Sequence, residues 1–236
     1  MDRTLLYIYG GENKEGPIII VGHGATTPRI SNNNILVKSL LPLVREIWSI
    51  ELPGHHKEIE NITTMNAEEV INDIQNVINQ KITETENIST LGFIGFSLSG
   101  ILCMRLENPP WDWNVYIGCG PRIDHSYLKN IQKYFTEETY IKYGFHIGMA
   151  NAFGKSWKER LKLVRKWFND DSIIVTTSVD GFSIPTLFIL AEQDQAFPTV
   201  YDKIDGLRIE KVKGHHFSYF TGEIFPSVWK RIVAFL

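Results

Sequence analysis

The stretch "TLGFIGFSLSG", residues 90–100, joins a short apolar run to a serine that has small residues on both sides. The apolar run predicts a buried strand, and the residues after Ser97 predict the start of a helix. Gly95 lies two residues before Ser97 and Ser99 two residues after it, which leaves room for a strained turn that lifts the Ser97 side chain above a sheet. The stretch therefore raises the question of whether Ser97 is a nucleophile or a packing residue.

Strand-like and helix-like segments alternate along most of the chain. "TLLYIYGG" and "GPIIIVGHG" predict two strands that form a hairpin or lie side by side, and the almost wholly apolar second run suits a strand covered on both faces. Further strands are predicted at "EIWSIELPG", "NVYIGCG", "IPTLFILAE" and "RIEKVKG". Helices are predicted at "NILVKSLLPLV", "LSGILCMRLE", "IFPSVWKRIVAFL" and "NAEEVINDIQNVINQKI", the last with Val70, Ile74, Val77 and Ile78 on one face. This alternation predicts an α/β fold with a mostly parallel central sheet flanked by helices.

One region interrupts the alternation. Residues from about 124 to 180 are mostly helix-like and aromatic, with no clear core strand before "SIPTLFIL". We interpret them as a small helical cap inserted into a single domain that spans residues 1–236. Part of the region, "KERLKLVRKWF", is expected to be the helix that crosses between two strands, with a solvated charged face.

Composition excludes several classes of function. The 24 lysines and arginines against 27 acidic residues give a net charge of −3, and no basic block suits a nucleic-acid partner. No apolar segment is long enough to span a bilayer and no targeting segment is recognisable, so we expect a cytoplasmic protein. Cys103 and Cys119 lack metal-site or disulfide spacing and are expected to be buried free thiols.

Five segments resemble motifs of the α/β-hydrolase superfamily and occur in its order along the chain. "GFSLSG" resembles the nucleophile elbow, G-x-S-x-G, with Ser97 at the nucleophile position and Ser99 where the last glycine usually stands. The resemblance implies the α/β-hydrolase fold. Ser99 is the weaker candidate for the nucleophile, because that register would place the branched Ile101 against the strand.

Two further segments resemble loops of the same superfamily. "IIIVGHGATT" is similar to its H-G segment, which implies that the backbone N–H groups of Ala25 and Leu98 form an oxyanion hole and that His23 shapes the turn by hydrogen bonding. "IELPGHHKE" is similar to its D-L-P-G-H-G turn, which implies that His55 and His56 are turn and surface residues rather than metal ligands.

The remaining two segments imply the other members of a catalytic triad. "PTLFILAEQDQAFP" resembles the segment that carries the acid, which falls on Asp194. In "IEKVKGHHFSYF" the base is His216 if the aromatic Phe217 is aligned, or His215 if the residue directly after Gly214 is aligned; we favour His216. The chain order Ser97, Asp194, His216 is the order of the superfamily.

The resemblance implies a serine hydrolase that cleaves an ester or thioester of a small to medium carboxylic acid through a Ser97 acyl-enzyme. The alternatives are an acyltransferase or lyase that uses the same serine, or a ligand-binding protein without turnover. We expect a small-molecule acyl substrate, no cofactor and no metal, and the oligomeric state stays open. Cap aromatics that could line an apolar pocket, or pack a core, are Tyr134, Phe135, Tyr140, Tyr143, Phe145, Phe153, Trp157 and Trp167.

Overall fold

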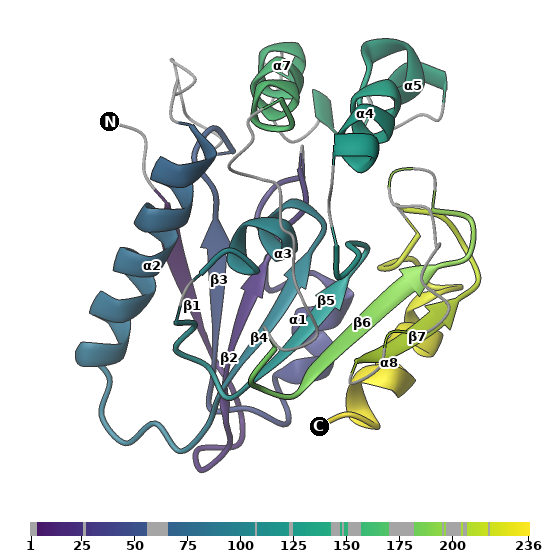
Figure 1. Ribbon diagram of the computed structural model, residues 1–236. Coiled ribbons are helices and arrows are strands. Elements are labelled where there is room, and N and C mark those ends of the chain that lie inside the picture. The colour runs from purple at the N-terminus through teal and green to yellow at the C-terminus, as the bar shows by residue number, and fades with distance from the viewer. Residues whose placement is uncertain are drawn as a thin grey trace.

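A seven-stranded sheet forms the centre of the protein (Figure 1). The computed structural model describes residues 4–25, 27–55, 66–106, 108–122, 125–142, 147, 149–150, 157–169, 182–194, 196, 204, 207–216 and 218–236. The strands are β1 (Leu5–Gly10), β2 (Ile18–Gly22), β3 (Glu46–Glu51), β4 (Leu91–Phe96), β5 (Trp113–Ile117), β6 (Thr186–Ala191) and β7 (Arg208–Val212). Their order across the sheet is β1-β3-β2-β4-β5-β6-β7, and every neighbouring pair is parallel except β1 with β3. The predicted α/β fold class is confirmed.

Helices cover both faces of the sheet (Figure 1). α2 (Ala67–Thr83) and α3 (Leu98–Cys103) lie on one face, and α1 (Ile35–Leu40) and α8 (Phe225–Val233) lie on the other. Each face has its own cluster of buried apolar side chains, with Ile18 and Ile20 of β2 in one cluster and Ile19 and Val21 in the other. Successive side chains of a strand point to opposite faces, so a strand covered on both sides must be apolar throughout. The continuous apolar run of β2 follows from this position.

Helix α2 begins at a capping box. The Asn66 side chain accepts from the Glu69 N–H, and the Glu69 carboxylate accepts from the Asn66 N–H. Val70, Ile74 and Ile78 are buried, as predicted, together with Ala67 and Ile71. Val77, however, is only half-buried, because the stripe that faces the sheet follows the spacing i, i+3, i+4, i+7 from residue 67 and passes beside it.

The predicted pairing of the first two strands is wrong. β1 pairs antiparallel with β3, Leu5 opposite Glu51, and does not lie beside β2. β3 and β4 occupy both edges of β2, so β1 cannot pair with β2 and instead pairs with the free edge of β3. After β1 the chain does not form a hairpin but lies against the residues just before β3, where the Gly11 N–H donates to the Arg45 carbonyl at 2.8 Å.

In the part of the chain that the structure describes, three helices lie beyond the carboxyl ends of the parallel strands, between β5 and β6 in sequence (Figure 1). They are α4 (His125–Tyr134), α5 (Glu137–Lys142) and α7 (Trp157–Trp167), and they fall where the sequence predicts an inserted cap. Phe135 and Tyr140 are fully buried, and Tyr134 and Trp157 are nearly so. Tyr143, Phe145, Phe153 and the side chain of Trp167 lie outside the described residues. No helix in the described part of the chain is both long and apolar enough to cross a membrane.

Candidate active site

Ser97 occupies a sharp turn between β4 and α3. Its backbone has φ 49° and ψ −113°, a conformation that costs a non-glycine residue about 1–3 kcal/mol. The surrounding structure holds the residue there: its N–H donates to the Ile117 carbonyl of the neighbouring strand at 2.9 Å. The turn places the Ser97 side chain at the carboxyl edge of the sheet, buried to 1% exposure.

The small residues around Ser97 allow the strand and the helix to approach closely. A Cβ on Gly100 would lie 2.6 Å from the Cys119 sulfur. Ser99, which stands where the motif usually has glycine, fits because Gly22 of β2 faces it; a Cβ on Gly22 would lie 2.5 Å from the Ser99 hydroxyl oxygen. The Ser99 hydroxyl donates to the Phe96 carbonyl at 3.1 Å. The departure at Ser99 is therefore matched by a glycine on the adjacent strand.

Three side chains from distant parts of the chain form a continuous hydrogen-bond chain. His216 Nε2 lies 2.9 Å from Ser97 Oγ, and His216 Nδ1 lies 2.8 Å from Asp194 Oδ2. Because a carboxylate only accepts, Nδ1 carries the proton and Nε2 accepts from the serine hydroxyl. All three side chains are buried, whereas His215 is exposed. The structure thus brings together Ser97, Asp194 and His216, the residues that the sequence favours, and leaves His215 outside.

Two more described groups donate to Asp194. Its Oδ1 accepts from the Ala196 N–H at 2.9 Å, and its Oδ2 accepts from the Tyr219 hydroxyl at 3.1 Å. Burial, and secondarily the Asp194 charge, raises the pKa of Tyr219 well above its usual value, so the phenol stays neutral and keeps its proton to donate. Tyr219 was not predicted as a site residue, since a tyrosine near a histidine has no sequence pattern that distinguishes it from a packing residue.

The loop after β2 is held by His23. The Leu52 N–H donates to His23 Nε2 at 3.0 Å, so Nδ1 carries the proton and donates to the Gly24 carbonyl at 2.8 Å. The Thr27 hydroxyl donates to the same carbonyl at 2.9 Å. In a trans peptide the carbonyl and the next N–H point in opposite directions, so fixing the Gly24 carbonyl also fixes the direction of the Ala25 N–H.

The same loop adjoins the turn at Ser97. A Cβ on Gly24 would lie 3.4 Å from Ser97 Cβ, and the Ser99 N–H donates to the His23 carbonyl at 3.3 Å. The elements that carry Ala25 and Leu98 therefore meet beside the serine.

His55 is not a surface residue, contrary to the sequence expectation. It is 1% exposed, its Nδ1 donates to the Pro53 carbonyl at 3.0 Å, and its ring centre lies 4.8 Å from that of His23. The turn after β3 folds inward against the loop after β2, and this contact between distant loops buries the ring. His56 lies outside the described residues.

Aromatic rings surround His216. Phe96 stacks on the imidazole with ring centres 5.5 Å apart, and Phe135, which follows α4, meets it edge-on at 6.2 Å. Phe135 in turn packs against Phe168, which follows α7, at 5.3 Å. The segment between β5 and β6 thus contributes directly to the environment of the histidine.

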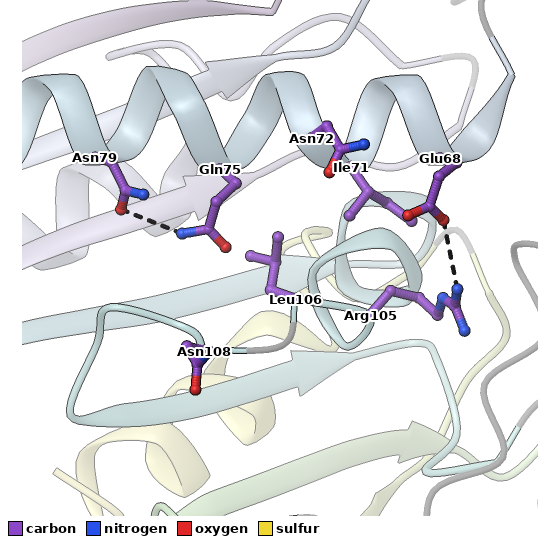
Figure 2. A pocket seen from close by; sticks show the side chains of 8 residues that line it. All are labelled: Glu68, Ile71, Asn72, Gln75, Asn79, Arg105, Leu106 and Asn108. Carbon is purple, nitrogen blue, oxygen red and sulfur yellow. Dashed lines mark hydrogen bonds and ion pairs between the residues drawn. The ribbon is translucent and has the colours of Figure 1, made fainter.

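Described residues line two hollows on the protein surface. One, of about 360 Å³, is bordered by His23, Phe96 and Phe220 and by the loop at residues 27–34. The other, of about 530 Å³, lies between α2 and the chain after α3 and has a largely carboxamide wall (Figure 2). Figure 2 shows the Gln75–Asn79 hydrogen bond on one side of it and the Glu68–Arg105 ion pair at one end. None of its lining residues belongs to the Ser97 site.

The chemistry available at the site is that of a serine, a histidine and a carboxylate. Among the residues that the structure describes, no group of three or more His, Cys, Asp or Glu side chains could hold a metal ion. Cys103 and Cys119 are buried free thiols, as predicted, and burial raises the pKa of both. Glu192, near Asp194 in sequence, is exposed.

No family model matches the sequence, and no curated protein is similar to it in sequence. Solved structures, by contrast, match almost the whole chain. The enol-lactonase from Burkholderia xenovorans has a TM-score of 0.71 at 16% identity, with 98% of this chain and 95% of that chain covered. MenH from S. aureus has a TM-score of 0.71 at 12% identity, with coverage of 98% and 97%. An α/β-hydrolase enzyme from a Medee basin deep-sea metagenome library has a TM-score of 0.70 at 12% identity, with coverage of 98% and 93%.

The chain has the α/β-hydrolase fold. The resemblance drawn from five short sequence segments is confirmed at the level of the fold, because the likeness to the solved structures extends over nearly the full length of each.

Proposed function

We propose that this protein is a serine hydrolase that cleaves an ester or thioester of a small to medium carboxylic acid. The observation that carries the proposal is the buried hydrogen-bond chain from Ser97 through His216 to Asp194, with distances of 2.9 and 2.8 Å. Each member has the geometry that its role requires: a hydroxyl on a strained turn, an imidazole that accepts from it, and a carboxylate that sets the tautomer.

In the first step, Ser97 Oγ attacks the substrate carbonyl carbon and its proton passes to His216 Nε2. The carbonyl oxygen becomes an oxyanion, which the N–H groups of Ala25 and Leu98 bind. Each such donor contributes about 3 kcal/mol to stabilising the transition state. The bonds from His23 and Thr27 to the Gly24 carbonyl support this role, because they orient the Ala25 N–H before the substrate arrives.

In the second step, the tetrahedral intermediate collapses. The bond to the leaving alcohol or thiol breaks, and His216 Nε2 returns its proton to that group, which leaves an acyl group on Ser97. Water then attacks the acyl-enzyme with His216 as the base, and the carboxylic acid departs. Asp194 stays ionised throughout and stabilises the imidazolium that forms in each half-reaction.

Residues from about 124 to 180 act in this proposal as a cap over the site. The contact of Phe135 with His216 supports a cap whose aromatic rings exclude water from the reacting atoms. The hollow of about 360 Å³ beside His23 and Phe96 is of a size for a small ligand group, which supports a modest acyl or alcohol portion.

A fluorophosphonate probe tests the proposal. We expect the probe to label the wild-type protein and the Ser99→Ala variant but not Ser97→Ala, since the Ser97 hydroxyl is hydrogen-bonded to His216 whereas the Ser99 hydroxyl donates to the Phe96 carbonyl. Hydrolysis of p-nitrophenyl esters and of matched thioesters of increasing chain length then defines the bond and the acid. Labelling without hydrolysis would indicate an acyltransferase or lyase, and absence of labelling would indicate a ligand-binding protein.

A further inference from the structure

The Tyr219 hydroxyl joins two parts of the candidate site. Its oxygen accepts from the Ala191 N–H, at the end of β6, at 2.7 Å, and lies 3.1 Å from Asp194 Oδ2. Oδ2 is the same oxygen that accepts from His216 Nδ1. The phenol is fully buried, so water does not compete for either bond.

The direction of the phenol proton follows from these partners. A phenol has one proton to donate, and the Ala191 N–H can only donate to its oxygen. The proton therefore goes to the carboxylate of Asp194. A hydrogen bond to a charged acceptor is stronger than one between neutral groups, so this contact restrains the carboxylate more than an ordinary tyrosine contact would.

The ring of Tyr219 packs against Gly118, Phe96 and His216. Gly118 has φ +64°, and a Cβ there would lie 2.8 Å from Tyr219 Cε2, so a side chain at position 118 would push the ring away. The ring also meets Phe96 and His216 edge-on, with centres 5.7 and 6.3 Å apart. Packing of the ring and the hydrogen bonds of the hydroxyl thus hold Tyr219 in the same position.

Tyr219 belongs to the same loop as His216, so its hydrogen bond to Asp194 joins the loop of the base to the turn of the acid. Asp194 lies in the turn after β6, and His216 and Tyr219 lie in the loop after β7. One side chain of the histidine loop is thereby bonded both to the strand that precedes the acid and to the acid itself. The distance between acid and base is held by this link in addition to their own hydrogen bond.

We propose that Tyr219 is a positioning residue that ties the Asp194 carboxylate to the end of β6 and so keeps Oδ2 directed at His216 Nδ1. The catalytic meaning of this link rests on the proposed function, but the link itself can be measured in the resting protein.

The test follows the proton on His216 Nδ1 by NMR, which needs no turnover. In Tyr219→Phe the ring remains and the hydroxyl is lost. We expect this proton to exchange with water about tenfold faster or more, as for the loss of one hydrogen bond to a charged group. In the matched control, Tyr116→Phe, another buried tyrosine loses its hydroxyl, and the exchange should stay at the wild-type rate.

The backbone N–H of Ile20, in the fully buried β2, reports general loosening of the fold. Faster exchange at His216 with unchanged exchange at Ile20 supports the proposal. Unchanged exchange at His216, or equal acceleration at both positions, overturns it. If Tyr219→Phe does not fold, a fluorinated tyrosine at position 219, whose hydroxyl is a stronger donor, should slow the His216 exchange, and the absence of slowing overturns the proposal.

Kinetics provides the second readout. With an activated ester, Tyr219→Phe should lower kcat about tenfold and leave KM unchanged, because the tyrosine acts on the acid and not on the substrate. A wild-type protein that hydrolyses no ester or thioester would refute the proposed function. The exchange measurement would still decide the role of Tyr219.

Discussion

Replacement of Asp194 by asparagine changes one atom and disturbs three hydrogen bonds. In the native protein Oδ2 accepts from His216 and from Tyr219, and Oδ1 accepts from the Ala196 N–H. An asparagine has one acceptor oxygen and one NH₂ group. If the NH₂ replaces Oδ2, it faces His216 Nδ1 and forces the imidazole proton onto Nε2, where the ring cannot accept from Ser97. If the NH₂ replaces Oδ1, it faces the Ala196 N–H, donor against donor.

The first arrangement gives the wrong tautomer. The second keeps the tautomer but leaves the Ala196 N–H unpaired, and the neutral amide no longer stabilises the imidazolium as the carboxylate does, so both arrangements weaken the base. We expect kcat for an activated ester to fall about 10⁴-fold, which corresponds to about 5.5 kcal/mol of transition-state stabilisation. The assay compares kcat for a p-nitrophenyl acyl ester in wild type, Asp194→Asn and the matched control Glu192→Gln, which removes an exposed carboxylate two residues away. Circular dichroism establishes that each variant is folded. A folded Asp194→Asn protein with activity within tenfold of wild type would show that another group serves as the acid.

Three further predictions concern the histidines, the elbow and the buried acids. His216→Ala should abolish ester hydrolysis and His215→Ala should keep most of it, since His216 is hydrogen-bonded to Ser97 and His215 is exposed; the reverse result would place the base at residue 215. Gly22→Ala should lower the free energy of unfolding by about 1–3 kcal/mol, because the new Cβ overlaps Ser99, and adding Ser99→Gly should recover most of the loss in urea titrations. If the double variant is no more stable than Gly22→Ala, the contact is not the cause.

The buried thiols and phenols make the free energy of unfolding depend on pH in the alkaline range. Burial raises the pKa of both thiols and of Tyr116 and Tyr219 in the folded state. The unfolded chain therefore releases these protons at lower pH than the folded one. The stabilisation is complete below about pH 8.5 and declines as the pH rises through the range in which unfolded thiols and phenols ionise. Urea unfolding at pH 7 and pH 10 measures the decline, and equal free energies at the two values would contradict it.

Local sequence patterns were sufficient for the class of fold. Apolar runs of strand length alternate with helical periodicity, and a strand covered on both faces must be apolar at every position, as β2 is. Ser97, Asp194 and His216 were recognisable because their segments resemble α/β-hydrolase motifs, and each residue follows a strand of the sheet. Residues that leave the same edge of one sheet meet in space whatever their separation along the chain.

Other features depended on which distant segments meet, and no local pattern contains that information. The antiparallel edge position of β1 follows from β3 and β4 having taken both sides of β2. His55 is buried because two loops pack against each other, although its neighbours in sequence resemble a surface turn.

The finer parts of the site were decided in the same way. Ser99 departs from its motif, and the structure accommodates it with Gly22, a residue 77 positions earlier whose space for a side chain is already filled. Tyr219 has no signature in sequence and acquires its bond to Asp194 only when the loop after β7 packs against the end of β6. Hydrophobic periodicity and turn chemistry act over a few residues and so determined the elements and their order, whereas hydrogen-bond partners across the core depend on packing geometry that only the folded chain possesses.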